Sequence, residues 1–451
     1  MNSLDFFNHL VENLGTYFLI WSLCFFTYCI ALRKCYFSIF DPLFVTIFFT
    51  SFSSSVVVYL FCFGLIDRRY FFSFCITEAC LVLGIYATGR LIQEPVCFSK
   101  KEEFSLKSTY AAIYLYSFVF TVFLIAQAIT YLKFGIPLFL TSRLTTYSGS
   151  GGYGILGRLL TAYTNVLIYF YIIFSFYLKE FQGPFLHFLN RATLVVLFVS
   201  FIFSGSKSAL LSVVFVFYSV QFYFSSIFPE KVAQADRKFK GLLPLVLILG
   251  VIGAFFTLGI QRKVTDGFEI AGLLAERMVA TGDVFFMAYP HGVIEKVKQK
   301  TDIFTATFVD FLAMTRMISS SEAPEPIGFA LTAYHYGPMP FGPNPRHNIL
   351  GYLYLGDYAF AYSFVLGCII GLFRNNRLVC FKRGYLFRLI HFLFFVQVRT
   401  IWSDPPLAVA HINGILFFLL PPLLFSLILS HITLKYNRQP KFFLSKPRSV
   451  I

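Results

Sequence analysis

Charged residues are scarce in this chain of 451 residues: only 13% are Asp, Glu, Lys or Arg, whereas 57% are hydrophobic. Soluble globular domains carry roughly a quarter charged residues. A soluble core of this length also divides into smaller domains before it buries so much apolar surface. The scarcity of charge therefore excludes an ordinary soluble protein and predicts a polytopic membrane protein, in which lipid solvates most of the side chains.

Several ligand-binding patterns are also missing. The nine Cys residues form no Cys-x-x-Cys pair, which argues against a zinc site and a disulfide framework. Asp-x-Asp does not occur, and the acids between the predicted spans form no ligand set for a hard metal ion. The glycine-rich run 149–157 lacks the Lys-Ser/Thr ending of a nucleotide-binding loop. We therefore expect neither a metal nor another cofactor.

Long apolar runs predict an all-α fold with about eleven transmembrane helices, because each run covers roughly 30 Å of hydrocarbon. The runs 192–204 and 385–402 are the weakest, since the first is short and the second carries Arg388, His391 and Arg399. We expect residues 1–451 to form a single membrane domain. The predicted spans are 15–32, 43–66, 70–88, 109–133, 155–178, 192–204, 209–227, 242–260, 352–373, 385–402 and 412–433.

Positive charge predicts the orientation of these spans. The six most basic connections hold 21 of the 37 Lys and Arg residues and only seven acids. Basic connections face the cytoplasm, so we expect the N-terminus outside and the C-terminus inside, with a break between two spans at 204–207. Most of the net charge of +15 thus sets topology and does not indicate a nucleic-acid partner. These connections are 33–41, 89–108, 179–191, 228–241, 374–384 and the tail from Lys435.

One connection, residues 261–350, is much longer than the others and is predicted to lie outside. It is nearly neutral, with eight Lys or Arg and nine Asp or Glu residues. Within it, apolar residues recur at helical spacing over 302–317. The Pro- and Gly-rich run 324–345 is too punctuated for regular structure. Because long connections are usually functional or disordered, and this one contains aromatic residues, we expect a function for it.

Cations recur at the predicted outer ends of helices. If the helices form a bundle, these cations lie around one outward-facing cavity. Such a cavity suits a diphosphate, because one guanidinium group can donate hydrogen bonds to two phosphate oxygens at once. The alternative is that a cation at a span end reaches the lipid headgroups, which we favour for Arg68, Arg69, Arg158 and Lys133. The candidates for diphosphate binding are Arg143, Lys207, Arg262, Arg277, Arg346 and Arg399.

With these residues placed, the chain resembles the Wzy-type O-antigen or oligosaccharide repeat-unit polymerases of Gram-negative bacteria. Members of that family carry Arg, ten residues and Gly in outer loops, and Arg143 and Gly154 have this spacing. In a second copy, Arg346 is followed by Gly356 after nine residues. The turn 204–207 resembles the family's Gly-Ser/Thr-Arg turn, with Lys207 in place of Arg. That replacement keeps the charge and loses the two-pronged guanidinium.

The resemblance implies a metal-independent glycosyltransferase with a GT-C-like helix bundle in the bacterial inner membrane. It would transfer a growing glycan from undecaprenyl diphosphate to a new undecaprenyl-diphosphate-linked repeat unit on the periplasmic face. Because diphosphate is already a good leaving group, the chemistry requires stabilisation of its charge and a base for the acceptor hydroxyl. A membrane protein that regulates chain length is a further expected partner.

The roles we expect follow from this chemistry. Arg143, Arg262, Arg277 and Arg399 would share the diphosphate and glycan contacts, with Lys207 in support. Arg346 and His347 would position the acceptor or take its proton, and Asp283 or Asp310 is the alternative base. Tyr289, Tyr334 and Tyr336 would stack on sugars.

Two alternative functions stay open at the level of sequence. An O-antigen ligase uses a similar bundle and donor, but its acceptor is the lipid A core. Loss of a polymerase leaves the core capped with one repeat unit, whereas loss of a ligase leaves it uncapped. A flippase for the same lipid-linked unit would carry its cations deep within the spans, whereas most of the candidate cations here lie at predicted outer helix ends or in the connection 261–350.

Overall fold

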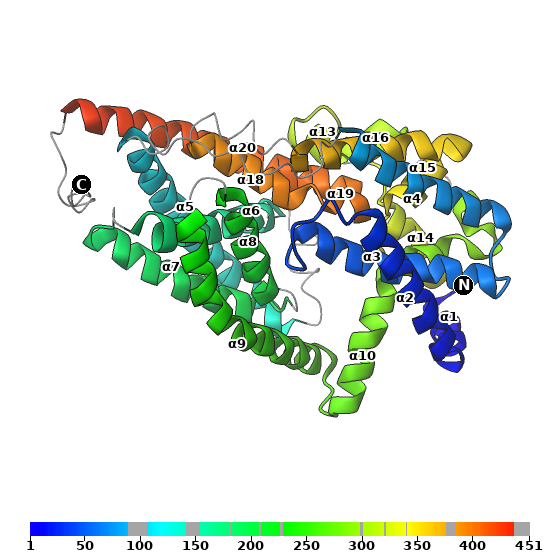
Figure 1. Ribbon diagram of the computed structural model, residues 1–451. Coiled ribbons are helices and arrows are strands. Elements are labelled where there is room, and N and C mark those ends of the chain that lie inside the picture. Colours follow the sequence, from blue (N-terminus) through cyan, green and yellow to red (C-terminus); the bar gives the residue numbers. More distant parts are fainter. Residues whose placement is uncertain are drawn as a thin grey trace. The chain divides into compact units, whose positions relative to one another are not determined.

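The fold is known from a computed structural model (Figure 1), in which every described regular element is a helix. The structure describes residues 1–88, 106–140, 154–179, 182–206, 209–225, 229–297, 301–319, 322–339, 341–375 and 385–436.

Within these ranges, nine helical segments are long and apolar enough to cross a membrane. Each of them overlaps one of the predicted spans, and seven begin within about five residues of the predicted start. The other two begin earlier: Pro184–Phe203 starts eight residues before the predicted span 192–204, and Pro405–Lys435 starts seven residues before 412–433. The expectation of an all-α polytopic membrane protein is thus confirmed. The other segments are Leu14–Ala31, Pro42–Cys62, Arg68–Thr88, Thr109–Phe139, Gly154–Tyr177, Leu243–Arg262 and His347–Arg374.

The remaining two predicted spans correspond to shorter helices. The run 209–227 forms α8 (Ala209–Phe224), and the run 385–402 forms α18 (Tyr385–Gln397) followed by the short α19 (Thr400–Ser403). At 1.5 Å per residue, α18 is shorter than the hydrocarbon layer. The number eleven therefore stays a prediction, and nine of the spans have helices of sufficient length among the described residues.

The chain forms two compact units, each built from segments that are distant in sequence. Unit 1 contains residues 1–93, 271–376 and 397–413, and unit 2 contains the rest. Besides α19, the helices that lie wholly in unit 1 are α1 (Ser3–Glu12), α2 (Leu14–Ala31), α3 (Pro42–Cys62), α4 (Arg68–Thr88), η6 (Ala280–Gly282), α11 (Asp283–Ala288), η7 (Pro290–Gly292), α12 (Val293–Lys296), α13 (Ile303–Met314), α14 (Ile327–Tyr336), α15 (His347–Leu355), η8 (Gly356–Tyr358) and α16 (Ala359–Asn375).

Among the described residues, unit 2 contains α8 and six other complete helices. In α9 the basic segment 228–241, predicted as a connection, is helical from Pro229 and continues into the apolar span. The six helices are α5 (Leu106–Phe134), η2 (Pro137–Phe139), α6 (Gly154–Ile172), η4 (Ile173–Tyr177), α7 (Pro184–Phe203) and α9 (Pro229–Arg262). The unit boundaries fall within α10 (Gly267–Val279), α18 and α20 (Pro405–Tyr436).

The break predicted at 204–207 is present, because α7 ends at Phe203 and α8 begins at Ala209. Gly205 has φ +59°, a conformation that side chains rarely adopt. A Cβ atom at this position would also lie 3.0 Å from the Nε2 atom of Gln261 and 3.2 Å from the backbone of Leu138. A glycine is therefore required where the chain turns between these two helices.

The long connection is mostly helical, and this corrects one expectation. The helix predicted over 302–317 is confirmed as α13, which Asp302 caps by accepting a hydrogen bond from the backbone N–H of Thr305. The run 324–345 was expected to lack regular structure, but it contains α14. Pro326 precedes that helix and Gly337, with φ +85°, ends it. Proline and glycine here mark the two ends of a helix, and the residues between them contain neither proline nor a second helix-ending glycine, so they form an uninterrupted helix.

Helices α4 and α16 of unit 1 pack against each other with almost no side chain between them. A Cβ atom on Gly367 would overlap the carbonyl oxygen of Leu81, and one on Gly84 would overlap that of Phe364. Gly371, one turn after Gly367, approaches α4 equally closely. Such small residues at four-residue spacing let transmembrane helices approach until their backbones touch. This seam fixes α4 against α16 over the second half of α4.

We expect Gly367→Leu to destabilise the protein by about 1–3 kcal/mol, because the new side chain must push α4 and α16 apart. Gly15→Leu is the matched control, since a Cβ atom there meets nothing within 4 Å. The thermal unfolding midpoint of each variant in detergent provides the measurement. Equal midpoints for the two variants would contradict this description of the seam.

Candidate functional site

The candidate site lies in unit 1, around the strained backbone of Arg346. This residue immediately precedes α15 and has φ +31° and ψ 150°. A residue other than glycine adopts a positive φ only at a cost in free energy, and such strain gathers at functional sites. Arg346 is also almost fully buried, with 3% of its surface exposed. The fold therefore holds an arginine in an unfavourable conformation and an unfavourable environment.

Contacts to one loop orient the guanidinium of Arg346. Its Nε and Nη2 atoms both donate to the carbonyl oxygen of Thr281, each at 3.3 Å. The guanidinium carbon lies 6.0 Å from the ring centroid of Phe285. Burial lowers the pKa of Arg346, and the carboxyl groups of Glu78, Asp283 and Asp404 act in the opposite direction. Arginine nevertheless stays charged, so Arg346 is a buried cation that interacts electrostatically with three acids.

Asp283 begins α11, two residues after the carbonyl group that Arg346 holds. The preceding residue, Gly282, packs so closely on α3 that a Cβ atom there would lie 2.8 Å from Val56 and 3.0 Å from Ser53. Asp283 itself stays partly accessible. Desolvation by the surrounding protein raises the pKa of Asp283 to about 7, although the charges of Arg277 and Arg346 lower it. A carboxyl group that titrates near neutral pH is suited to proton transfer.

Arg277 contributes a second positive charge from the last turn of α10. Unlike Arg346, it is exposed, and it acts electrostatically on Asp283. Asp283, which is partly buried, thus interacts electrostatically with one exposed and one buried arginine. Among the described residues of the predicted site, these interactions link Arg277, Asp283 and Arg346, and His347 adjoins Arg346 in the chain.

His347 lies beside this group, but its side chain is fully enclosed. Its Nδ1 atom is 2.9 Å from the hydroxyl of Ser363, and its Nε2 atom is 3.3 Å from the carboxylate of Glu78. The second contact is ionic in range but not aligned as a hydrogen bond. With 0% of its surface exposed, His347 is placed to hold α15 against α4.

Glu78 of α4 is the centre of a buried polar network. The Nε1 atom of Trp402 donates to Glu78 Oε2 at 3.2 Å, and the Nδ2 atom of Asn348 lies 3.3 Å from Oε1. Asn348 also donates to the hydroxyl of Thr77 at 2.8 Å. A buried carboxylate is tolerated only when several donors compensate for its lost hydration. The network therefore ties α15 and α19 to α4 directly behind Arg346.

Asp404 is a further acid near Arg346. It is 8% exposed, and it caps α20 by accepting a hydrogen bond from the backbone N–H of Leu407 at 2.9 Å. Burial raises the pKa of Asp404 to about 6, and Arg346 acts against this shift. Asp404 thus provides negative charge close to Arg346 while it starts the last helix.

The tyrosines that we expected to stack on sugars lie in different environments. Tyr289 is 1% exposed, and its ring stacks on Tyr70 at 5.1 Å and lies 5.5 Å from Phe285. Both faces of this ring are covered. Tyr334 of α14 is 49% exposed, and Lys296 lies 6.0 Å from its ring centroid. Tyr334 therefore has the accessible ring that stacking on a sugar requires.

The remaining predicted residues lie elsewhere in the chain. Arg399 interacts electrostatically with Asp41 and Arg374, which form a buried ion pair at 2.6 Å. Asp310 accepts a hydrogen bond from Asn413 at 3.2 Å. Gly154 is the first residue of α6 and Arg262 the last of α9, both in unit 2. Arg143 and Lys207 lie outside the described residues.

Sequence reasoning did not assign Glu78 or Asp404 to the site. Glu78 is an acid within an apolar run, and such residues mark functional positions by default. Asp404 precedes Pro405 and Pro406, a signal for the start of a helix that an acidic cap strengthens. Neither signal indicates that both acids face Arg346, because α4 and α19 are more than 300 residues apart in the chain.

We expect Glu78→Ala to destabilise the protein by about 3 kcal/mol, because it leaves the donors of Asn348 and Trp402 buried without their acceptor. Glu276→Ala is the control: it removes the same carboxyl group from the exposed side of α10 and should leave the free energy of unfolding nearly unchanged. Thermal unfolding in detergent compares the two variants. An unchanged midpoint in Glu78→Ala would show that the network contributes little.

Among the described residues, no group of three or more His, Cys, Asp or Glu side chains is arranged to hold a metal ion. The chain matches none of the protein-family models, curated proteins or solved structures with which it was compared.

Proposed function

We propose that this protein polymerises undecaprenyl-diphosphate-linked oligosaccharide repeat units on the periplasmic face of a bacterial inner membrane. The product would be O-antigen or a related surface polysaccharide. The observation that carries the proposal is the group formed by Asp283, Arg277 and Arg346: a partly buried aspartate with a pKa of about 7 that interacts electrostatically with two arginines. Such a group combines a base with positive charge, which are the two requirements of this reaction.

The location of the group supports an activity on the outer side of the membrane. All three residues lie in the 261–350 segment, which the distribution of Lys and Arg predicts to be outside. They also lie outside the nine helical segments that are able to cross the membrane. A site there is accessible to two lipid-linked substrates whose sugars project from the same face of the bilayer.

In the proposed reaction the acceptor hydroxyl oxygen attacks the anomeric carbon of the donor glycan. A new glycosidic C–O bond forms while the bond between that carbon and the diphosphate oxygen breaks. Undecaprenyl diphosphate departs with the electron pair, and the hydroxyl proton passes to the carboxylate of Asp283. The exposed guanidinium of Arg277 stabilises the charge that grows on the departing diphosphate.

Arg346 acts in this scheme as a positioning residue. It is too deeply buried to contact a diphosphate, but it holds the carbonyl group of Thr281 and so orients the start of α11. Its charge also keeps the pKa of Asp283 from rising further. His347, enclosed by Glu78 and Ser363, supports Arg346 from behind.

The other predicted contacts belong to the same proposal. Tyr334 would stack on a sugar ring of the acceptor or the growing chain, because its ring is accessible. The remaining cations would hold lipid diphosphate or glycan, and a membrane protein that regulates chain length would be the partner. These residues are Arg143 with Gly154, Lys207, Arg262 and Arg399.

We expect the rate of polymerisation by the purified protein to rise with pH through about 7 and to level off above it. The reason is that burial raises the pKa of Asp283, so the carboxylate that accepts the proton is fully formed only above this pH. Asp283→Asn should lower the rate at pH 8 by at least about 100-fold. The substrate is lipid-diphosphate repeat unit extracted from host cells that lack the gene, and gel electrophoresis measures the product ladder.

Asp302→Asn is the control for this experiment. Asp302 is an exposed acid of the same segment, and asparagine also caps a helix, so this variant should keep the rate and the pH profile of the wild type. A wild-type ladder from Asp283→Asn would rule out Asp283 as the base. Absence of any ladder from the wild-type protein would argue against the polymerase itself.

We expect Arg277→Ala to lower kcat by about 100-fold, because a charge-stabilising donor acts mainly on the transition state. Arg277→Lys should restore part of the rate, since it keeps the charge and loses the planar fork. Arg316→Ala removes an exposed arginine from the same segment and should leave kcat unchanged. A loss confined to KM in Arg277→Ala would instead assign Arg277 to substrate binding alone.

A further inference from the structure

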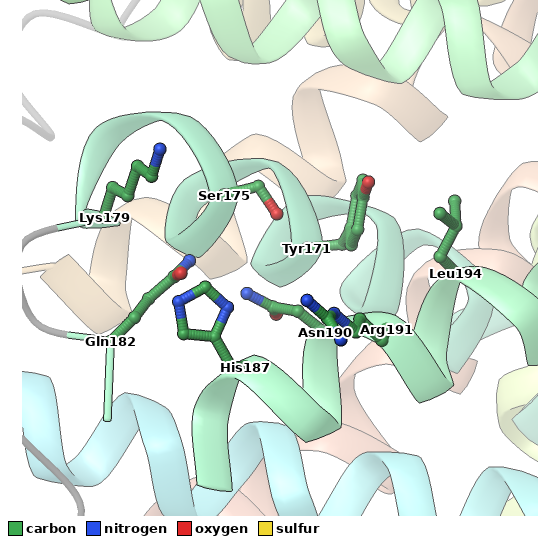
Figure 2. Close-up of a pocket in the computed structure, with 8 residues that line it drawn as sticks. All are labelled: Tyr171, Ser175, Lys179, Gln182, His187, Asn190, Arg191 and Leu194. Atoms are coloured by element: carbon green, nitrogen blue, oxygen red, sulfur yellow. The ribbon is translucent and has the colours of Figure 1, made fainter. Parts of the chain in front are cut away.

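A small, open pocket lies in unit 2. It is formed where α6 and η4 end and α7 begins, and its volume is about 200 Å³. Figure 2 shows Lys179 and Ser175 on one wall, with His187 and Asn190 of α7 opposite them. The lining residues are Tyr171, Ser175, Lys179, Gln182, His187, Asn190, Arg191 and Leu194.

Asn190 is the strongest indication that this pocket binds something. It is 5% exposed, and among the described residues neither its Nδ2 nor its Oδ1 atom has a hydrogen-bond partner. Buried amide groups are nearly always paired, because an unpaired polar group retains the full cost of its desolvation. Figure 2 shows the amide of Asn190 directed between α7 and η4, into the pocket. A ligand with polar atoms in the pocket would satisfy it.

The charge around the pocket indicates the class of ligand. Lys179 and Arg191 are exposed at its rim, and His187 lies between them in the lining. The N-terminus of α7 adds the partial positive charge of the helix dipole. Among the described lining residues there is no Asp or Glu. Positive charge without a lining acid favours an anion.

The local backbone contributes to the shape of the pocket. Residues Ile173–Tyr177 form a π-helical turn, a rare conformation that often occurs at functional sites. The side-chain amide nitrogen of Gln182 donates to the carbonyl oxygen of Phe174 within this turn. This bond holds the side chain of Gln182, a lining residue, against the π-helical turn.

We propose that this pocket binds a phosphate group, either in the headgroup of an anionic phospholipid or as free phosphate. Arg191 and Lys179 would pair with the phosphate oxygens, and the Nδ2 atom of Asn190 would donate to one of them. The volume is below the roughly 300–1,000 Å³ of pockets for larger ligands, so a headgroup fits and an oligosaccharide does not. This site is independent of the proposed polymerase activity.

The predicted topology favours the lipid as the source of the phosphate. The pocket includes part of the basic connection 179–191, which is expected on the cytoplasmic side. Basic pockets between transmembrane helices on that side bind anionic headgroups. Leu194 follows Asn190 by one helical turn on α7 and lines the same pocket, where an acyl chain would continue from the headgroup.

The test uses the full chain in detergent, titrated with phosphatidylglycerol or phosphatidylcholine and analysed by native mass spectrometry. The first equivalent of phosphatidylglycerol should bind at least about tenfold more tightly than phosphatidylcholine, whose choline places a cation among Lys179, His187 and Arg191. Asn190→Asp and Arg191→Ala should each weaken the binding of phosphatidylglycerol by about tenfold. Arg237→Ala, which removes an exposed arginine of α9, is the matched control.

Competition with inorganic phosphate distinguishes the two sources. Displacement of phosphatidylglycerol by millimolar phosphate supports a site for the phosphate group alone. Failure of phosphate to compete, together with weaker binding in the variants, supports the site and assigns the ligand as a lipid. Equal binding of both lipids, or unchanged binding in both variants, would overturn the proposal.

A variant that fails to fold does not obscure the result. Arg191 is exposed, so Arg191→Ala should keep the unfolding midpoint of the wild type and can be interpreted without Asn190→Asp. The thermal midpoint of each variant in detergent confirms this before the titration. If Arg191→Ala folds normally and binds phosphatidylglycerol as tightly as Arg237→Ala does, the pocket does not bind the headgroup.

Discussion

The contact between α4 and α16 is the interaction on which the arrangement of unit 1 depends. In lipid the hydrophobic effect does not drive helices together, so close van der Waals packing must do so. Gly84, Gly367 and Gly371 allow this approach because they lack side chains, and the hydroxyl of Thr88 adds a hydrogen bond to the carbonyl oxygen of Cys368. Larger residues in this seam would separate α4 from α15 as well, since α15 precedes α16 with only one turn between them.

From this seam the polar site follows step by step. Glu78 is brought to His347 and Asn348 at the start of α15, and the donor of Trp402 completes its shell. With α15 held in this way, Arg346 immediately before it is confined to a strained conformation and reaches the carbonyl group of Thr281. That contact orients the loop before Asp283. The position of Asp283 therefore depends on glycine contacts in a different pair of helices.

The protein uses positive charge in more than one way. Basic connections supply most of the net charge, as expected if they determine topology. Arg346 is a buried cation that interacts electrostatically with acids, and its guanidinium donates hydrogen bonds to the backbone carbonyl oxygen of Thr281. Arg277 and Arg191 are exposed and free to meet an anion. Arg346, Arg277 and Arg191 have the same side chain, so their different roles come from their burial and from the groups around them.

The sequence alone determined the class of the protein and much of its helical pattern. Hydropathy and length predicted nine segments that the described structure contains as helices, because a span in lipid must satisfy its own backbone hydrogen bonds locally. Local patterns also predicted α13 and the break after α7, but they failed at α14, where Pro and Gly mark helix ends. The tertiary structure alone decided that Glu78, Asp283 and Asp404 act electrostatically on Arg346, that Tyr289 is covered and Tyr334 is open, and that Asn190 faces a pocket. The features around Arg346 arise from contacts between residues far apart in the chain, and the pocket at Asn190 depends on how two consecutive helices pack, so no local pattern records them.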